Sequence, residues 1–352
     1  MSYQFTEVGA GGINHVGLDE PTPEQAALWA EILTAIDGTQ ADGATEKWSH
    51  SLHSGDVYSV FERDGVVYSA SDDETVKAVD ASDGSELWSH SLHTDDVQSV
   101  FARDGVVYSG SWDYTVKAVD ASDGSEIWSH SHHSFNVNSV FERDGVVYSG
   151  ASDETVKAVD ASDGSEIWSH SLHSDYVYSV FERDGVVYSG GGYDDQTVKA
   201  VDASDGSEIW SHDLHSNTVY SVSVGDGVVY SGSWDDSVIA ADASDQSEIW
   251  SHDLHSDRVY SVFERDGVVY SGSWDDTVKA ADASDGSEIW SHSLHSSRVE
   301  SVFERDGVVY SGAQDQTVKA AELVDENGDS LEEEPNSWQL RVSDGDDWYP
   351  VG

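Results

Sequence analysis

Residues 48–87 read WSHSLHSGDVYSVFERDGVVYSASDDETVKAVDASDGSEL, and the chain repeats this forty-residue stretch seven times with few changes. A tryptophan opens each copy, and successive tryptophans lie 40, 40, 40, 42, 40 and 40 residues apart. These anchor tryptophans are Trp48, Trp88, Trp128, Trp168, Trp210, Trp250 and Trp290. Apolar and polar residues alternate over short runs that turn residues interrupt, which is typical of β-strands. A strand-rich repeat of this length predicts a β-propeller with one blade per copy.

Four strands are expected in each copy. In the first copy, strands a, b, c and d cover residues 57–62, 66–69, 75–81 and 86–92. Asp-Gly pairs between strands a and b and between strands c and d provide the chemistry for two turns. This order places the d–a and b–c loops on one face of the ring and the a–b and c–d turns on the opposite face.

The two ends of the repeat region predict how the ring closes. The chain enters through a d strand at Trp48 and leaves through a c strand that ends at Val324. We therefore expect an all-β, seven-bladed propeller of four-stranded blades over residues 47–324, in which the Trp48 strand completes the last blade. Such closure leaves no unpaired strand edge in the ring.

Residues 1–46 form an expected attachment segment with one helix at 23–37. Thr22 and Gln25 make a capping box, and Gly38 follows the helix. The apolar stripe of this helix consists of Leu28, Trp29, Ile32, Leu33 and Ile36.

Residues 325–352 predict an acidic linker followed by a hairpin-like tail that carries Trp338 and Trp348. Apolar residues at both ends of the chain need to be covered, either by the propeller or by neighbouring subunits. We interpret them as residues that attach the propeller to a larger assembly.

The charge balance is strongly acidic. Sixteen Lys and Arg oppose 69 Asp and Glu, which gives a net charge of −53. Such a surface repels itself in dilute buffer, and molar salt screens the repulsion because the Debye length falls to about 3 Å. We therefore expect a halophilic protein. The acidic surface offers no patch of cations for phosphates, which excludes nucleic acid as a partner.

The absence of cysteine excludes disulfides and zinc–thiolate sites. The first thirty residues show no secretory signal, and no apolar stretch reaches the roughly 20 residues of a membrane span. We expect no membrane insertion. The expected location is a virus particle released by lysis into brine or, alternatively, the cytoplasm of a halophilic archaeon.

The first half of the repeat resembles the WD repeat. His53, Ser69 and Asp73 match three members of that family's hydrogen-bonded tetrad, and Val79 stands where the family has a tryptophan. The resemblance implies a structural role for these three residues and their counterparts in the other blades.

The second half of the repeat is similar to the tryptophan-docking motif of quinoprotein-type propellers, with Ala78, Asp80, Gly84 and Trp88 at the matching positions. The resemblance implies that the anchor tryptophans are structural. Quinone-dependent dehydrogenases of that kind have eight blades and a cysteine pair beside the cofactor, whereas this chain has seven repeats and no cysteine. We expect no enzymatic activity and no cofactor.

Metal binding is the alternative for two recurring patterns. His-x-x-His, as in His50 and His53, provides two imidazoles per copy, but residues three apart on a strand point to opposite faces. The acidic turns around Asp83 suggest calcium, although Asp-Gly turn chemistry explains them without an ion. We therefore expect no metal.

The copies differ mainly at three positions per blade, all on the face of the d–a and b–c loops. The residue before the strand-a valine is Asp56, Asp96, Asn136, Tyr176, Thr218, Arg258 or Arg298. The residue after that valine is Tyr58, Gln98, Asn138, Tyr178, Tyr220, Tyr260 or Glu300. The residue before the b–c aspartate is Asp72, Trp112, Ser152, Asp194, Trp234, Trp274 or Gln314. Tyr114, Phe135 and Tyr193 lie beside these positions, and Tyr193 belongs to a two-residue insertion in blade four.

The turns of the opposite face hardly vary, except in blade five, which has Ser223-Val224-Gly225 and Gln246. Neutral drift of exposed residues would have changed both faces. The variable face is also rich in tryptophan, tyrosine and arginine, the residues of binding hot spots. In WD-repeat propellers these positions bind partners, and the resemblance implies the same here.

The sequence therefore predicts a non-enzymatic propeller that binds a protein or a surface glycan through this diversified face. Both termini would contact other subunits in a larger, homo-oligomeric assembly. The favoured setting is a fibre, turret or tail component of a halophilic virus that recognises its host, and a protein-interaction scaffold of a halophilic archaeon is the alternative. A lectin-like propeller is a third hypothesis, in which Trp112, Trp234 and Trp274 stack on sugars and the following aspartates accept hydroxyl groups. A quinone-dependent dehydrogenase ranks last.

Overall fold

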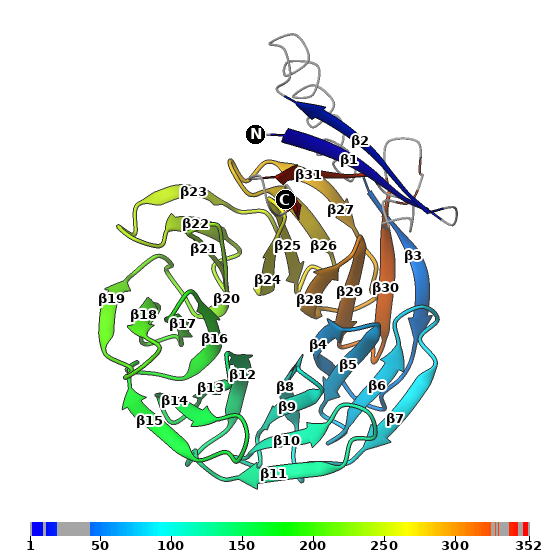
Figure 1. Cartoon of the computed structure of the whole chain (residues 1–352). Helices are drawn as coiled ribbons and strands as arrows, with labels where there is room; N and C mark the ends of the chain where they lie inside the picture. Colours follow the sequence, from blue (N-terminus) through cyan, green and yellow to red (C-terminus); the bar gives the residue numbers. More distant parts are fainter. Residues whose placement is uncertain are drawn as a thin grey trace.

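The computed structural model describes residues 43–324, Gly328 and Ser330 with their side chains, and the backbone of residues 2–9, 12–19, 338–343 and 348–350. It confirms the predicted seven-bladed propeller of four-stranded antiparallel sheets (Figure 1). The expected helix at 23–37 and its apolar stripe lie outside the described residues. Among the residues described, no helix has the length and hydrophobicity to cross a membrane.

Each blade runs from an inner strand at the channel to an outer strand at the rim. Blade one has β4 (Val57–Arg63), β5 (Val66–Ser71), β6 (Val76–Asp80) and β7 (Glu86–His90), and blade two has β8 (Val97–Arg103), β9 (Val106–Ser111), β10 (Val116–Asp120) and β11 (Glu126–His130). Blade three has β12 (Val137–Arg143), β13 (Val146–Ala151), β14 (Thr155–Asp160) and β15 (Glu166–Ser171), and blade four has β16 (Val177–Arg183), β17 (Val186–Gly191), β18 (Val198–Asp202) and β19 (Glu208–His212). Blade five has β20 (Val219–Gly225), β21 (Val228–Ser233), β22 (Val238–Asp242) and β23 (Glu248–His252), and blade six has β24 (Val259–Arg265), β25 (Val268–Ser273), β26 (Val278–Asp282) and β27 (Glu288–His292). Blade seven has β28 (Val299–Arg305), β29 (Val308–Ala313), β30 (Val318–Val324) and β3 (Gly43–His50).

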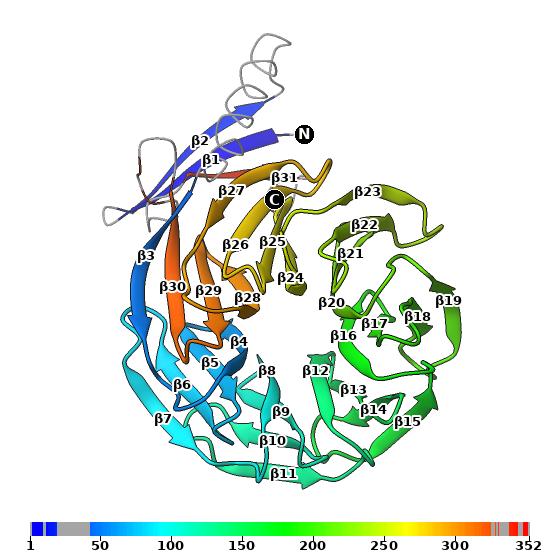
Figure 2. The ribbon, with the colours of Figure 1, turned by 180° about the vertical axis from the view of Figure 1, so that it is seen from behind.

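The ring closes as the sequence predicts. Strand β3 pairs antiparallel with β30, with Trp48 opposite Ala320, so the first strand of the repeat region is the outer strand of the last blade (Figure 2). The two ends of the repeat region are therefore held in one sheet, and the ring has no open edge at its seam.

A separate four-stranded sheet lies outside the ring, in the order β2-β1-β31-β32 (Figure 1). It joins β1 (Ser2–Gly9) and β2 (Gly12–Asp19) to β31 (Trp338–Ser343) and β32 (Trp348–Pro350). Strands β31 and β32 pair antiparallel, in agreement with the predicted hairpin-like tail. Strands β1 and β2 were not predicted, and β1 brings the N-terminal segment into one sheet with the tail.

The anchor tryptophans connect neighbouring blades. The Trp88 indole packs against Tyr68 of its own blade, with ring centroids 6.0 Å apart, and donates its N–H to the Ala121 carbonyl of the next blade at 2.9 Å. Six of the seven tryptophans donate in this way. Among the described residues none accepts from the Trp290 N–H, and the next blade continues β30 through Leu323 where the others have the alanine that begins the c–d turn.

The c–d turns require a residue with positive φ. Glycine takes this place at five turns, as at Gly206 with φ of +71°, but Gln246 takes it in blade five with φ of +60°. At Gly206 the ring of His170 lies so close that a Cβ would be 2.4 Å from its Cδ2 atom, and His170 contacts the Asp205 carbonyl at 2.9 Å. In the part of the chain that the structure describes, His212 makes no such contact beside Gln246, and Trp210 is more exposed than the other anchor tryptophans.

We expect Gln246→Gly to raise the free energy of unfolding by about 1 kcal/mol, because it removes a left-handed non-glycine residue and makes room for His212. Urea unfolding followed by circular dichroism measures the change. The reciprocal variant Gly206→Gln should be destabilised by at least as much. A stability unchanged in both variants would contradict this account of the turn.

Candidate binding face

The backbone itself brings two of the three variable positions of a blade together. The Trp112 N–H donates to the Asp96 carbonyl at 2.9 Å, and the Trp274 N–H donates to the Arg258 carbonyl at 3.0 Å. The same bond forms in every blade except the fourth, where the two-residue insertion replaces it with a bond from the Asp194 N–H to the Asp175 carboxylate. The variable residues before strand a and before the b–c aspartate are therefore neighbours on one face.

A repeated hydrogen-bond network supports this face from below. The His53 ring is held at Nε2 by the Ser69 hydroxyl at 2.8 Å and at Nδ1 by the Asp73 carboxylate at 3.1 Å. Because a carboxylate only accepts, Nδ1 carries the proton. Asp73 also accepts from the Ser54 and Thr75 backbone N–H groups. Hydrogen bonds from His53 and Thr75 hold the pKa of Asp73 well below its usual range, against the opposing effect of burial.

The network recurs in all seven blades through the aspartates Asp73, Asp113, Asp153, Asp195, Asp235, Asp275 and Asp315. Its histidine, serine and aspartate were expected from the sequence, whereas the threonine two residues after the aspartate, which is Ser237 in blade five, was not. The threonine could have been found from the Thr-Val-Lys-Ala run, which recurs in most copies directly after the b–c turn. The described residues contain no group of three or more metal-ligating side chains. His50 contacts the Asp83 carbonyl of the c–d turn, so it lies away from His53.

An arc of aromatic and arginine side chains crosses blades four to seven. We call it the aromatic arc, and its members are Tyr176, Tyr178, Tyr220, Trp234, Arg258, Tyr260, Trp274 and Arg298. The Tyr220 ring lies at its centre, with centroid distances of 5.1 Å to Tyr178 and 4.5 Å to Tyr260. Tyr220 also stacks on Trp234 at 6.2 Å. Seven sequence-predicted positions from blades four to six thus form one connected surface with Arg298 of blade seven.

Arg258 is held between two tryptophans. Its guanidinium carbon lies 3.5 Å from the Trp234 ring centroid and 4.3 Å from the Trp274 centroid. Each such cation–π contact contributes about 0.5–2 kcal/mol, depending on how far the pair is removed from water. The two rings therefore fix the guanidinium plane, and a hydrogen bond from Arg258 to Tyr260 holds it from a third side.

Arg258 also differs electrostatically from every other cation that the structure describes. Seven lysines and eight arginines have described side chains, and all of them except Arg258 lie within 4.0 Å of a carboxylate. In a chain with 69 acidic residues, this leaves on the face a positive group that no described carboxylate approaches within 4.0 Å, although its charge acts on the more distant Asp236.

Arg298 links the aromatic arc to an acidic group. It lies 4.8 Å from the Trp274 ring centroid, forms an ion pair with Glu300, and approaches Asp56 at 3.9 Å. Asp56, Asp72, Asp96, Glu300 and Tyr58 make up this acidic group on blades one, two and seven.

Burial and mutual repulsion shift the carboxyl groups of the acidic group. Burial, followed by the charges of Asp72 and Asp95, raises the pKa of Asp96 to about 6. Burial raises the pKa of Glu300 to about 7, an effect larger than the opposing attraction of Arg298. Burial and the neighbouring Asp56 also raise the pKa of Asp72.

The remaining predicted face residues do not join the aromatic arc. The Asn138 amide donates to the Ser152 hydroxyl at 3.1 Å and to the Val177 carbonyl at 3.0 Å, so this side chain is internally occupied. Tyr114 packs on Phe135 with centroids 5.9 Å apart, and Ser297 donates to Gln314. These other positions, completed by Trp112, Gln98, Asn136 and Tyr193, lie outside the arc.

The carboxylates that the lectin hypothesis needs are already occupied. Asp113, Asp235 and Asp275, which follow the three tryptophans, accept from the histidines and from backbone N–H groups of the support network. Their side chains retain 9–17% exposure. They are poorly placed to accept sugar hydroxyls.

Comparison with known proteins places the chain among propellers. A family model described as the outer membrane protein assembly factor BamB matches residues 30–183, 152–257 and 194–337. The crystal structure of the WD40 β-propeller domain of Doa1 is similar with a TM-score of 0.70 and 23% identity, over 79% of this chain and 96% of that one. The computationally designed Ika8 protein is similar with a TM-score of 0.64 and 25% identity, over 79% and 99% of the two chains. No curated protein matches the chain.

Proposed function

The chain belongs to the family of the outer membrane protein assembly factor BamB, and we propose that it is a non-enzymatic binding module that holds a partner on the aromatic arc. The observation that carries the proposal is Arg258, whose guanidinium lies between two partly exposed tryptophans and has no described carboxylate within 4.0 Å. Aromatic and arginine side chains of this kind dominate binding energy at interfaces. The partner that fits is a protein with a surface carboxylate, because a carboxylate can accept two N–H groups from the guanidinium edge.

A family description that names an assembly factor agrees with a role exercised through binding. The carboxylates of the chain also support a non-enzymatic role. Most of them recur in register from blade to blade, and those of the support network are engaged in structural hydrogen bonds. Conversion of any alcohol or sugar in the presence of added quinone and calcium would refute the non-enzymatic part of the proposal.

Arg258→Ala should weaken partner binding by about 2 kcal/mol or more, the range of a binding hot spot. Arg258→Lys should lose nearly as much, because lysine keeps the charge but not the flat, doubly donating group. Immobilised protein in molar salt would be used to capture partners from a haloarchaeal lysate, and bound protein would be quantified against bait concentration. Ile127→Ala, which truncates an exposed apolar residue on the outer strand β11, is the matched control. Equal capture by all four proteins would exclude the aromatic arc as the binding site.

We further propose that the propeller works inside a larger assembly, with a halophilic virus particle as the favoured setting and a haloarchaeal scaffold as the alternative. The net charge of −53 and the joining of both termini in one sheet outside the ring support this idea. Antibodies against the protein should label purified virus particles. Recovery as a free monomer from cells, and never with particles, would refute the viral setting and leave the scaffold.

A further inference from the structure

The opposite face of the ring carries a belt of phenylalanines on the inner strands. Neighbouring rings touch around the channel, with centroid distances of 4.4–4.7 Å. The members are Phe61, Phe101, Phe141, Phe181, Phe263 and Phe303. Blade five interrupts the belt with Ser223, so Phe181 of blade four and Phe263 of blade six face a gap.

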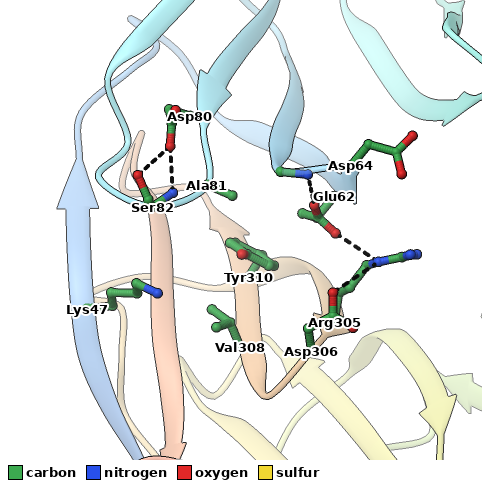
Figure 3. Close-up of a pocket in the computed structure, with 11 residues that line it drawn as sticks. Lys47, Glu62, Asp64, Asp80, Ala81, Ser82, Arg305, Asp306, Val308 and Tyr310 are labelled. Carbon is green, nitrogen blue, oxygen red and sulfur yellow. Dashed lines mark hydrogen bonds and ion pairs between the residues drawn. The ribbon is translucent and has the colours of Figure 1, made fainter. Parts of the chain in front are cut away.

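Ion pairs between blades accompany this belt. The arginine two residues after the phenylalanine reaches the glutamate one residue after the phenylalanine of the next blade, as in Arg143 with Glu182 at 3.6 Å and Arg265 with Glu304 at 3.4 Å. Figure 3 shows the pair at the junction of the last and first blades, where Arg305 approaches Glu62 at 3.2 Å. These glutamates are buried, with 3–5% exposure.

Blade five lacks the phenylalanine, the glutamate and the arginine. It has Ser223-Val224-Gly225 where the first blade has Phe-Glu-Arg. Arg183 of blade four therefore has no glutamate to meet and approaches only the exposed Asp184, at 3.8 Å. Glu264 of blade six has no arginine within 4.0 Å and is partly exposed, unlike its buried counterparts, and the more distant charge of Arg183 only partly offsets the burial that raises its pKa.

A cavity of 240 Å³ occupies this place. Its lining residues are Phe181, Arg183, Val224, Asp226, Phe263, Glu264, Arg265 and Asp266. Two of its walls are the phenylalanine rings on either side of the gap, and Arg183 and Glu264 contribute opposite charges. The Glu264 carboxylate lies over Gly225, in space that a side chain at this position would fill. Arg265 is already paired with Glu304 and Asp266.

Blade two provides an internal comparison, because it changes only one of the three residues. Ala102 replaces the glutamate there, which leaves Arg63 without its inter-blade partner. Phe101 nevertheless packs on Phe61 at 4.4 Å, and Arg103 still pairs with Glu142 at 3.6 Å. The belt is therefore interrupted only where the phenylalanine is lost. A cation and an anion are both left without their inter-blade partners only where one blade lacks the glutamate and the arginine together.

We propose that this cavity binds a small zwitterion with an aromatic ring, such as a free aromatic α-amino acid. The ligand provides what blade five lacks: a ring between Phe181 and Phe263, a carboxylate for Arg183 and an ammonium group for Glu264. Offset or edge-to-face contacts of the ring with the two phenylalanines are favourable, and the Arg183 guanidinium can bind a carboxylate with two hydrogen bonds. The cavity far exceeds the roughly 10–15 Å³ that one water needs and stays below the roughly 300 Å³ at which pockets for drug-sized ligands begin.

Isothermal titration calorimetry with L-phenylalanine tests the proposal on the full chain, at the lowest salt concentration that keeps the circular dichroism spectrum unchanged. We expect saturable binding with a Kd of about 1 mM or lower. Phenethylamine, which lacks the carboxylate, and 3-phenylpropionate, which lacks the ammonium group, should each bind at least about tenfold more weakly. These ligand comparisons need no substitution, so they test the site even where a variant fails to fold.

The matched variant restores the sequence of the first blade through Ser223→Phe, Val224→Glu and Gly225→Arg together. It should lose phenylalanine binding and unfold at a higher temperature, since the belt and both ion pairs are completed. Arg183→Gln should remove the preference for phenylalanine over phenethylamine, and Glu264→Gln the preference over 3-phenylpropionate. Absent binding, equal binding by the filled variant, or equal affinity for all three ligands would each overturn the proposal. None of these outcomes bears on the aromatic arc, which lies on the other face.

Discussion

We expect Asp113→Ala to lower the free energy of unfolding by about 3–5 kcal/mol, the cost of removing one partner from a buried charged network. The Asp113 carboxylate accepts from the His93 ring at 3.0 Å and from the backbone N–H groups of Thr94 and Thr115 at 3.1 and 3.0 Å. The His93 side chain is fully buried. Alanine would leave these donors without an acceptor in a place that water reaches poorly, and an unsatisfied buried donor is costly.

Asp123→Ala is the matched control for this variant. Asp123 also accepts a backbone hydrogen bond, from Ser125 at 2.9 Å, but it lies exposed in a turn on the opposite face. Its loss should cost much less than the loss of the Asp113 carboxylate, because surface substitutions away from buried networks change stability little. Urea unfolding of the native protein and both variants gives the comparison. Similar losses in the two variants would show that the support network contributes no more than an ordinary turn.

The consequence of Asp113→Ala should also be local to the binding face. Asp113 follows Trp112, whose backbone N–H holds the d–a loop at Asp96. Without the carboxylate, both loops of blade two lose their anchor, whereas the aromatic arc on blades four to seven keeps its own supports. Partner binding through the aromatic arc should therefore survive in the folded fraction of this variant.

The architecture of the ring could be predicted because the same pattern of strands and turns occurs in seven copies. A forty-residue period, an Asp-Gly turn at fixed places and an offset of one strand between Trp48 and Val324 together permit one closed arrangement. The two N-terminal strands were harder to recognise because β1 and β2 occur once. Their alternation at Tyr3 and Phe5 was the available signal.

The position of the candidate face was predictable, but its internal chemistry was not. Comparison of the copies identified the variable positions, and blade geometry put them on one side of the ring. The insertion of Arg258 between Trp234 and Trp274 depends on side-chain directions across two blades, which no single repeat contains. The same holds for the cavity, because Arg183 and Glu264 belong to different repeats and line it together only once blades four to six have packed.

The pH dependence of stability should show a maximum between pH 4 and pH 5, with losses on both sides. On the acid side, the seven support aspartates have a lowered pKa in the folded state. The unfolded chain then binds more protons than the folded chain below about pH 4, so stability falls as the pH decreases through this range. Because seven equivalent groups act together, the acid limb should be steep.

On the alkaline side, buried carboxyl groups act in the opposite direction. Burial raises the pKa of Glu300 and of Glu304 to about 7 and that of Asp96 to about 6. The unfolded chain releases these protons near pH 4, whereas the folded chain retains them until pH 6 to 7, so stability falls as the pH rises between these values. The growing net negative charge adds repulsion in the same direction.

Thermal unfolding from pH 2 to pH 9 at constant molar salt measures both limbs. Glu300→Gln separates the acid limb from the alkaline limb. The glutamine amide stays neutral at every pH, so the variant lacks one cause of the loss of stability at alkaline pH, and the support aspartates are unchanged. The melting temperature of this variant should fall less between pH 5 and pH 8 than that of the native protein, and the two curves should descend in parallel below pH 4. A melting temperature that rises steadily to pH 8 would mean that the acidic group of the binding face is ionised at little cost. In that case the acidic group would already be negatively charged when a cationic partner binds. If stability instead falls above its maximum as expected, the carboxyl groups of the acidic group hold protons, and a cationic partner must displace these protons on binding.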